Sequence, residues 1–148
     1  MRRKCHAHGI HVGLANKRRG VTLAGGVHGT YVVRQPPELV GRAYRFALAA
    51  LRFYRKLPKS PDAQVPGVQF YRAALSGWSN YRASQRGRSR AEFIAKLGSA
   101  VEESDEAVGW LEFMKDADIS SDGPLLAEAR EICAVLTASL RNARNNSG

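Results

Sequence analysis

The stretch SNYRASQRGRSRAEF, residues 79–93, holds four arginines in nine positions, and no acidic residue stands among them. The four are Arg82, Arg86, Arg88 and Arg90. Arg88 and Arg90 flank the start of a predicted helix, where a positive side chain opposes the helix dipole. The free backbone N–H groups at such a helix start favour an anion instead. The stretch therefore predicts a surface that binds anionic groups such as phosphates.

Two interpretations of these arginines remain open. In the first, they contact the phosphates of a nucleic acid and Tyr81 offers a stacking surface. Further phosphates are contacted from the N-terminal tail by Lys17, Arg18 and Arg19. Such binding would tolerate any sequence and depend strongly on salt, because each neutralised phosphate releases counterions. In the second, the arginines pair with acidic residues of a neighbouring subunit.

A second set of side chains has the chemistry of zinc ligands. The set lies within seven residues near the N-terminus and consists of Cys5, His6, His8 and His11. The surrounding segment is rich in glycine and has no helical period, so no ordered element is predicted to hold these ligands in place. The sequence therefore favours a solvated tail without a metal.

The rest of the chain has few side chains of the types that catalyse reactions. No histidine follows His28, so no imidazole base and no Glu-x-x-His metal pair is available there. Cys133 lies beside Ile132 on an apolar stripe, which is typical of a buried thiol. Four acids fall on the outer face of a predicted helix and are expected to be solvated: Glu102, Glu103, Asp105 and Glu106. We expect no enzymatic activity, no catalytic residue and no cofactor.

The charge divides the chain into parts that we expect to have different roles. The net charge is +10 over 148 residues, which indicates that the protein binds a polyanion, an acidic protein or a membrane surface. Residues 1–38 carry seven Lys or Arg against one acid (+6), residues 39–96 twelve against two (+10), and residues 97–148 four against ten (−6). The sequence thus has a basic tail, a basic first half of the body and an acidic second half.

Helical periodicity begins at Glu38 and predicts four helices, at 38–57, 67–86, 89–117 and 124–144. The second follows a loop, KSPDAQVPG, and contains Gly77, which we expect at a close crossing with another helix. The third begins with the clearest local signal. Ser89 and Glu92 form a capping box after Gly87, a residue that commonly ends a helix.

Four amphipathic helices joined by short loops predict an all-α, up-down-up-down antiparallel four-helix bundle over residues 38–146. Residues 1–37 are expected to be a mostly disordered basic tail, since a lone hairpin of its short apolar runs would be marginal. No apolar run is long enough to span a bilayer, and Cys5 and Cys133 lie far apart in the sequence. We expect a cytoplasmic protein with no membrane partner.

The sequence also resembles the small four-helix bundle proteins, similar to the protein encoded in intervening sequences of bacterial 23S ribosomal RNA genes. The resemblance covers about residues 38–145. It is carried by FALAALRFYRKLPKS, by ALSGWSNYRASQRGRSRAEFIAKLGSAVEESDEAVGWLEFM and by LLAEAREICAVLTASLR. The sequence departs from the family at Trp78, where a small residue is usual, and at Pro66.

The resemblance implies partners and assembly but no catalytic residues. It implies an up-down bundle that forms barrel-like homopentamers. A more distant resemblance, to the accessory protein of diversity-generating retroelements, implies a basic subunit that binds nucleic acid and a reverse transcriptase.

The charge pattern independently predicts a homo-oligomer. A basic half and an acidic half on one chain allow head-to-tail contacts, and such contacts close into rings. Phe53 and Trp110 are the expected apolar anchors of this interface. An oligomeric scaffold, in which the charges serve assembly alone, is the alternative to nucleic-acid binding.

Overall fold

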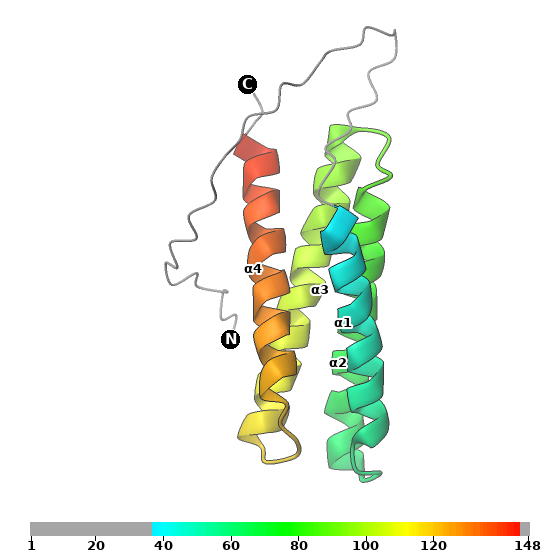
Figure 1. Ribbon diagram of the computed structural model, residues 1–148, viewed down its shortest axis with the longest axis vertical. Helices are drawn as coiled ribbons and strands as arrows, with labels where there is room; N and C mark the ends of the chain where they lie inside the picture. The colour runs from blue at the N-terminus through cyan, green and yellow to red at the C-terminus, as the bar shows by residue number, and fades with distance from the viewer. Residues whose placement is uncertain (1–36, 146–148) are drawn as a thin grey trace, which may run out of the picture.

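A computed structural model describes residues 37–145, and these residues form four helices and no strand. The helices are α1 (Pro37–Lys56), α2 (Pro61–Ser84), α3 (Arg90–Asp116) and α4 (Gly123–Asn145). They run alternately down and up, side by side along one long axis (Figure 1). The predicted all-α four-helix bundle is confirmed.

The core is built from the apolar stripes that the periodicity predicts. Phe70 of α2, Leu97 and Met114 of α3 and Leu136 of α4 have no more than 1% of their surface exposed. Cys133 is also fully buried, as its place on an apolar stripe predicts. No helix within residues 37–145 is both long and apolar enough to cross a membrane.

The predicted start of α2 is wrong, because the helix begins at Pro61 and not at Gly67. Pro61 occupies the first helical position, where the N–H that proline lacks would have no partner anyway. Pro66 lies inside the helix and removes one backbone hydrogen bond. Its ring is buried together with Ala63 and Gly67, so packing against the bundle offsets that loss.

The most extensive contact in the bundle is between α2 and α3, and it depends on a small residue in each helix. A Cβ atom on Gly77 would stand 3.2 Å from Ser104 Oγ, closer than most such contacts. The side chain of Ser104 is itself buried. The predicted close helix crossing at Gly77 is therefore confirmed.

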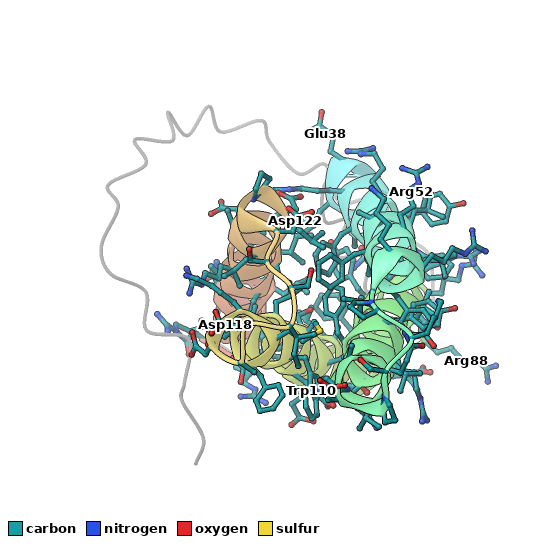
Figure 2. All side chains as sticks on the ribbon, turned by 90° about the horizontal axis from the view of Figure 1, so that it is seen from below. Glu38, Arg52, Arg88, Trp110, Asp118 and Asp122 are labelled. Atoms are coloured by element: carbon teal, nitrogen blue, oxygen red, sulfur yellow. The ribbon has the colours of Figure 1, made fainter. Side chains whose placement is uncertain are left out.

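The turn from α3 to α4 uses two devices that end and start helices. Asp118 takes a left-handed conformation (φ 54°), and the N–H of Ile119 donates to the carbonyl of Met114 at 2.9 Å, as in a Schellman motif. Asp122 then caps α4, since its Oδ1 accepts from the N–H of Leu125 at 2.9 Å. Figure 2 shows both aspartates at this end of the bundle.

The contact between α1 and α4 is the smallest in the bundle, and an ion pair spans it. Arg42 donates from Nε and Nη2 to the two carboxylate oxygens of Glu128, at 2.6 and 2.7 Å. This two-pronged hydrogen bond holds the pKa of Glu128 below its ordinary value and raises the pKa of Arg42. The pair thus links the first and last helices across the smallest helix–helix contact of the bundle.

The predicted capping box starts α3. Ser89 Oγ accepts from the N–H of Glu92 at 3.1 Å, and the carboxylate of Glu92 accepts from the N–H of Arg88 at 2.8 Å. The carboxylate therefore reaches one residue further back than in the usual motif, in which it binds the N–H of the cap residue itself.

Replacing the cap tests this boundary. Ser89→Ala should lower the free energy of unfolding by about 1 kcal/mol, because the N–H of Glu92 loses its acceptor. Urea titration measures the change, and Ser99→Ala, on the surface of the same helix, serves as a control. Equal stability of the Ser89 variant and the parent would contradict the assigned cap.

Candidate nucleic-acid interface

The turn between α2 and α3 is tight, and this places its arginines at the surface. A Cβ atom on Gly87 would lie 3.0 Å from the backbone N of Phe93 and 3.2 Å from the carbonyl oxygen of Ser84. Backbone atoms cannot move aside as a side chain can, so the turn closes this tightly only around glycine. Arg86 and Arg88, on either side of Gly87, are both exposed.

The four predicted arginines do not share one environment. Arg82, Arg86 and Arg88 are exposed, and none of them forms an ion pair with another of the described residues. Arg90 is half-buried and donates from Nη2 to the carbonyl oxygen of Ala143 in the last turn of α4. A cation at a helix C-terminus is favourable, so Arg90 helps to hold α4 against the start of α3.

Tyr81 is not a stacking surface, and that prediction is wrong. Its side chain is 0% exposed and lies in the core, on the same stripe of α2 as Phe70 and Gly77. Its hydroxyl group is buried without a hydrogen-bond partner among the described residues. Burial raises the pKa of Tyr81 to about 12.

This shift predicts a loss of stability in alkali. The unfolded chain releases the Tyr81 proton near the ordinary pKa of 10, while the folded chain holds it until about pH 12. The contribution of Tyr81 to the free energy of unfolding is therefore fully present below pH 10. It is lost as the pH rises from 10 to 12, by about 1.4 kcal/mol per pH unit. Urea titrations across this range measure it. Tyr81→Phe should make the free energy of unfolding depend less steeply on pH, whereas Tyr44→Phe should not. Equal pH dependence in the parent and both variants would refute the assignment of this loss to Tyr81.

An aromatic pair that the sequence reasoning missed lies next to Arg82. The rings of Tyr44 on α1 and Trp78 on α2 are 5.3 Å apart between centroids and tilted by 51°. The Arg82 guanidinium lies 5.8 Å from the centroid of the Trp78 ring, within the range of a cation–π contact. Tyr44 is 47% exposed. The spacing of Trp78 and Arg82, one helical turn apart on α2, was the available signal.

Further cations extend this surface along α1. Arg52 and Arg55 are exposed and, like Arg82, form no ion pair with another described residue. Figure 2 shows Arg52 and Arg88 reaching outward on the side of the bundle where α1 and α2 lie. We call this surface the α1–α2 basic face; its arginines are Arg52, Arg55, Arg82, Arg86 and Arg88.

The acidic charge gathers on α3. This helix carries seven acidic residues against three basic ones, whereas α1 carries one against five. Burial and the neighbouring carboxylates of Glu106 and Glu102 raise the pKa of Glu103. Glu102 and Glu106 are exposed, and Glu103 and Asp105 are half-buried, so the four acids lie on or near the surface as expected.

The two predicted interface anchors differ in position. Phe53 is only 8% exposed and packs edge-on against Phe70 in the core, with ring centroids 5.6 Å apart, so its assignment as an anchor is wrong. Trp110 lies at the outer side of α3 (Figure 2), where its Nε1 donates to Glu106 at 3.0 Å. Beside it is Phe113, 52% exposed, with ring centroids 5.9 Å apart. Phe113 was not predicted.

The remaining predicted site residues fall outside the described residues. These are Lys17, Arg18 and Arg19 of the basic tail and the group Cys5, His6, His8 and His11. Within residues 37–145, no three His, Cys, Asp or Glu side chains are grouped in a way that could hold a metal ion.

Comparisons with known proteins bear on the fold. No protein-family model and no curated protein matches the sequence. A solved structure from Bacteroides thetaiotaomicron, a protein of unknown function from the S23 ribosomal protein family, is similar with a TM-score of 0.65 and 24% sequence identity. The match covers 70% of this chain and 98% of that one. It is consistent with the family resemblance in the sequence, and it shows that the two chains share the four-helix fold.

Proposed function

We propose that this protein is a non-enzymatic, ring-forming four-helix bundle that binds RNA or DNA through the α1–α2 basic face. The observation that carries the proposal is the set of exposed arginines on this face, which make no ion pairs with other described residues. Folding alone gives no reason to gather cations that repel one another. A polyanion along the face would neutralise them and release its own counterions.

The chemistry of the face fits backbone recognition without a sequence preference. Guanidinium groups bind phosphates with two parallel hydrogen bonds, and this contact carries no information about the bases. The face extends from the last turns of α1 to the turn after α2, at the opposite end of the bundle. Its length is about that of α2, roughly 36 Å at 1.5 Å per residue, which is enough for several successive phosphates.

The test compares two variants that remove the same charge. Arg82→Gln/Arg86→Gln/Arg88→Gln changes the basic face, and Lys96→Gln/Lys115→Gln/Arg141→Gln changes three exposed cations of α3 and α4. Arg90 is kept because it binds the carbonyl of Ala143. Binding to labelled RNA and DNA is measured by fluorescence anisotropy over a salt series, and light scattering reports the oligomer.

The arginine variant should bind more weakly and with a flatter salt dependence. The slope of log affinity against log salt falls by about 0.7 to 0.9 for each lost phosphate contact, so three lost contacts flatten it by about two to three. The control variant should keep most of the slope, although it has lost the same net charge. Equal behaviour of the two variants would refute the assignment to this face.

A second candidate function is an interaction scaffold, and the pair formed by half-buried Trp110 and exposed Phe113 favours it. The pair lies on acidic α3, so the basic face of one subunit can meet α3 of the next with both charge and apolar contact. The family resemblance sets the expected number of subunits at five. A ring that dissociates in the arginine variant would favour this scaffold, whereas an intact ring with weaker nucleic-acid binding favours the first function.

A further inference from the structure

The α1–α2 basic face has aromatic rings as well as cations, and this combination narrows the choice of ligand. Besides Tyr44 and Trp78, the rings of Tyr54 and Tyr71 stack across the same two helices, 5.5 Å apart and within 7° of parallel. Between the two pairs lie three half-buried leucines, Leu48, Leu51 and Leu75. The face is therefore an apolar, aromatic seam with arginines along it.

We propose that this face binds an unpaired nucleic-acid strand, with a base stacked on Tyr44 and the adjoining phosphate held by Arg82. The inference rests on the proposed function and names the form of nucleic acid that the face prefers. Single strands are bound by positive surfaces that also offer aromatic rings, since an unpaired base exposes its flat faces. A duplex covers those faces by base stacking, and it would use only the arginines.

The geometry around Trp78 places both kinds of contact at one point. Tyr44 is the more exposed ring of its pair, so it has free surface for a base. The Arg82 guanidinium lies 5.8 Å from the centroid of the Trp78 ring, and Tyr44 contacts the same ring from α1, so the cation and the exposed ring share Trp78 as a neighbour. Because Arg82 is exposed and makes no ion pair with another described residue, its guanidinium is available to the phosphate of the same strand.

The second aromatic pair gives the strand a direction along the face. Tyr54 follows Tyr44 by ten residues on α1, which is about 15 Å along the helix. Arg55 follows Tyr54 in the sequence and is exposed, so each end of the seam has an aromatic ring and an exposed arginine within one helical turn of it. A nucleic-acid strand that runs along the seam between α1 and α2 would therefore find an aromatic ring and an arginine at two places.

The test separates stacking from charge. Tyr44→Leu removes the ring but keeps an apolar side chain against Trp78. Phe113→Leu makes the same kind of change at a similarly exposed ring on acidic α3. The probes are oligo(U), oligo(dT) and a blunt duplex of matched length, measured by anisotropy at fixed salt. The arginine triple variant is included, and polyglutamate serves as a competitor without bases.

Tyr44→Leu should weaken binding of oligo(U) and oligo(dT) by about 5- to 150-fold, since a stacked base contributes roughly 1–3 kcal/mol and each 1.4 kcal/mol is about a factor of ten. Its affinity for the duplex should not change, and Phe113→Leu should bind all probes like the parent. In a Trp110→Phe background, the fluorescence of Trp78 should be quenched by the single strands and not by the duplex.

The outcomes distinguish the inference from the function on which it rests. If Tyr44→Leu binds single strands like the parent while the arginine variant loses affinity for all nucleic acids, the stacking inference is wrong and the proposed function stands. If polyglutamate displaces the strands at equal charge, the face recognises an acidic polymer, and the inference is also wrong. If neither variant changes nucleic-acid binding, both proposals fail.

Discussion

Phe70→Ala should lower the free energy of unfolding by about 3–5 kcal/mol, the usual cost of removing a fully buried phenylalanine. Phe70 is 0% exposed, and two rings of α1 meet it edge-on: Phe53 at 5.6 Å and Phe46 at 6.2 Å between centroids. The substitution leaves a cavity and removes both aromatic contacts, which contribute beyond the buried area. It therefore weakens the packing of α1 against α2 at its centre.

Urea titration followed by circular dichroism measures this loss. Phe113→Ala is the matched control, because Phe113 is 52% exposed and its removal should change stability by only about 0.5 kcal/mol. A loss below about 1 kcal/mol for Phe70→Ala would mean that the aromatic cluster is not the centre of the core.

Gly67→Ala should be destabilising, by about 1–3 kcal/mol, although alanine is the better helix former. A Cβ atom at this position would collide with Leu57 Cδ1 and lie 3.2 Å from Tyr54 Cδ2. Leu57 is only 4% exposed, so its side chain has little free space into which it can move. The added methyl group thus forces α2 away from the end of α1.

Gly109→Ala provides the opposite expectation within the same protein. Gly109 is exposed on α3, and a Cβ atom added there would have no neighbouring atom within 4 Å. This change should therefore raise the free energy of unfolding by up to about 1 kcal/mol, the difference in helix propensity. Differential scanning calorimetry of the two variants compares them directly. A stabilised Gly67→Ala protein would contradict the close contact between α1 and α2.

The sequence predicts the fold well because the helices are long and strongly periodic. The third predicted helix, 89–117, matches α3 to within one residue at each end, since Ser89 offers an unambiguous cap. The second does not match at its start. Pro61, Pro66 and Gly67 are individually typical of a loop, and only their burial against the bundle shows why they are helical here. That tertiary contribution is not visible in the local sequence.

The site was predicted less well, because the sequence pattern does not fix which faces of two helices contact each other. Tyr81 continues the stripe of Phe70, Ala74 and Gly77, and its position in that stripe predicts burial better than its closeness to the arginines predicts exposure. Trp78 lies on the neighbouring stripe and reaches Tyr44 only because α1 packs there. A contact between two helices depends on their rotation about their own axes, which periodicity leaves undetermined.

The unequal contacts between the helices have a consequence for how the bundle opens in its native state. α2 and α3 follow each other in the chain and share the most extensive contact, whereas α1 and α4 share the least. Transient opening should therefore begin when the Arg42–Glu128 ion pair breaks and α1 separates from α4, while α2 and α3 stay packed together. Backbone amides of α3 would then exchange with solvent deuterium more slowly than those of α1, and α2 and α3 together would act as the last cooperative unit to unfold.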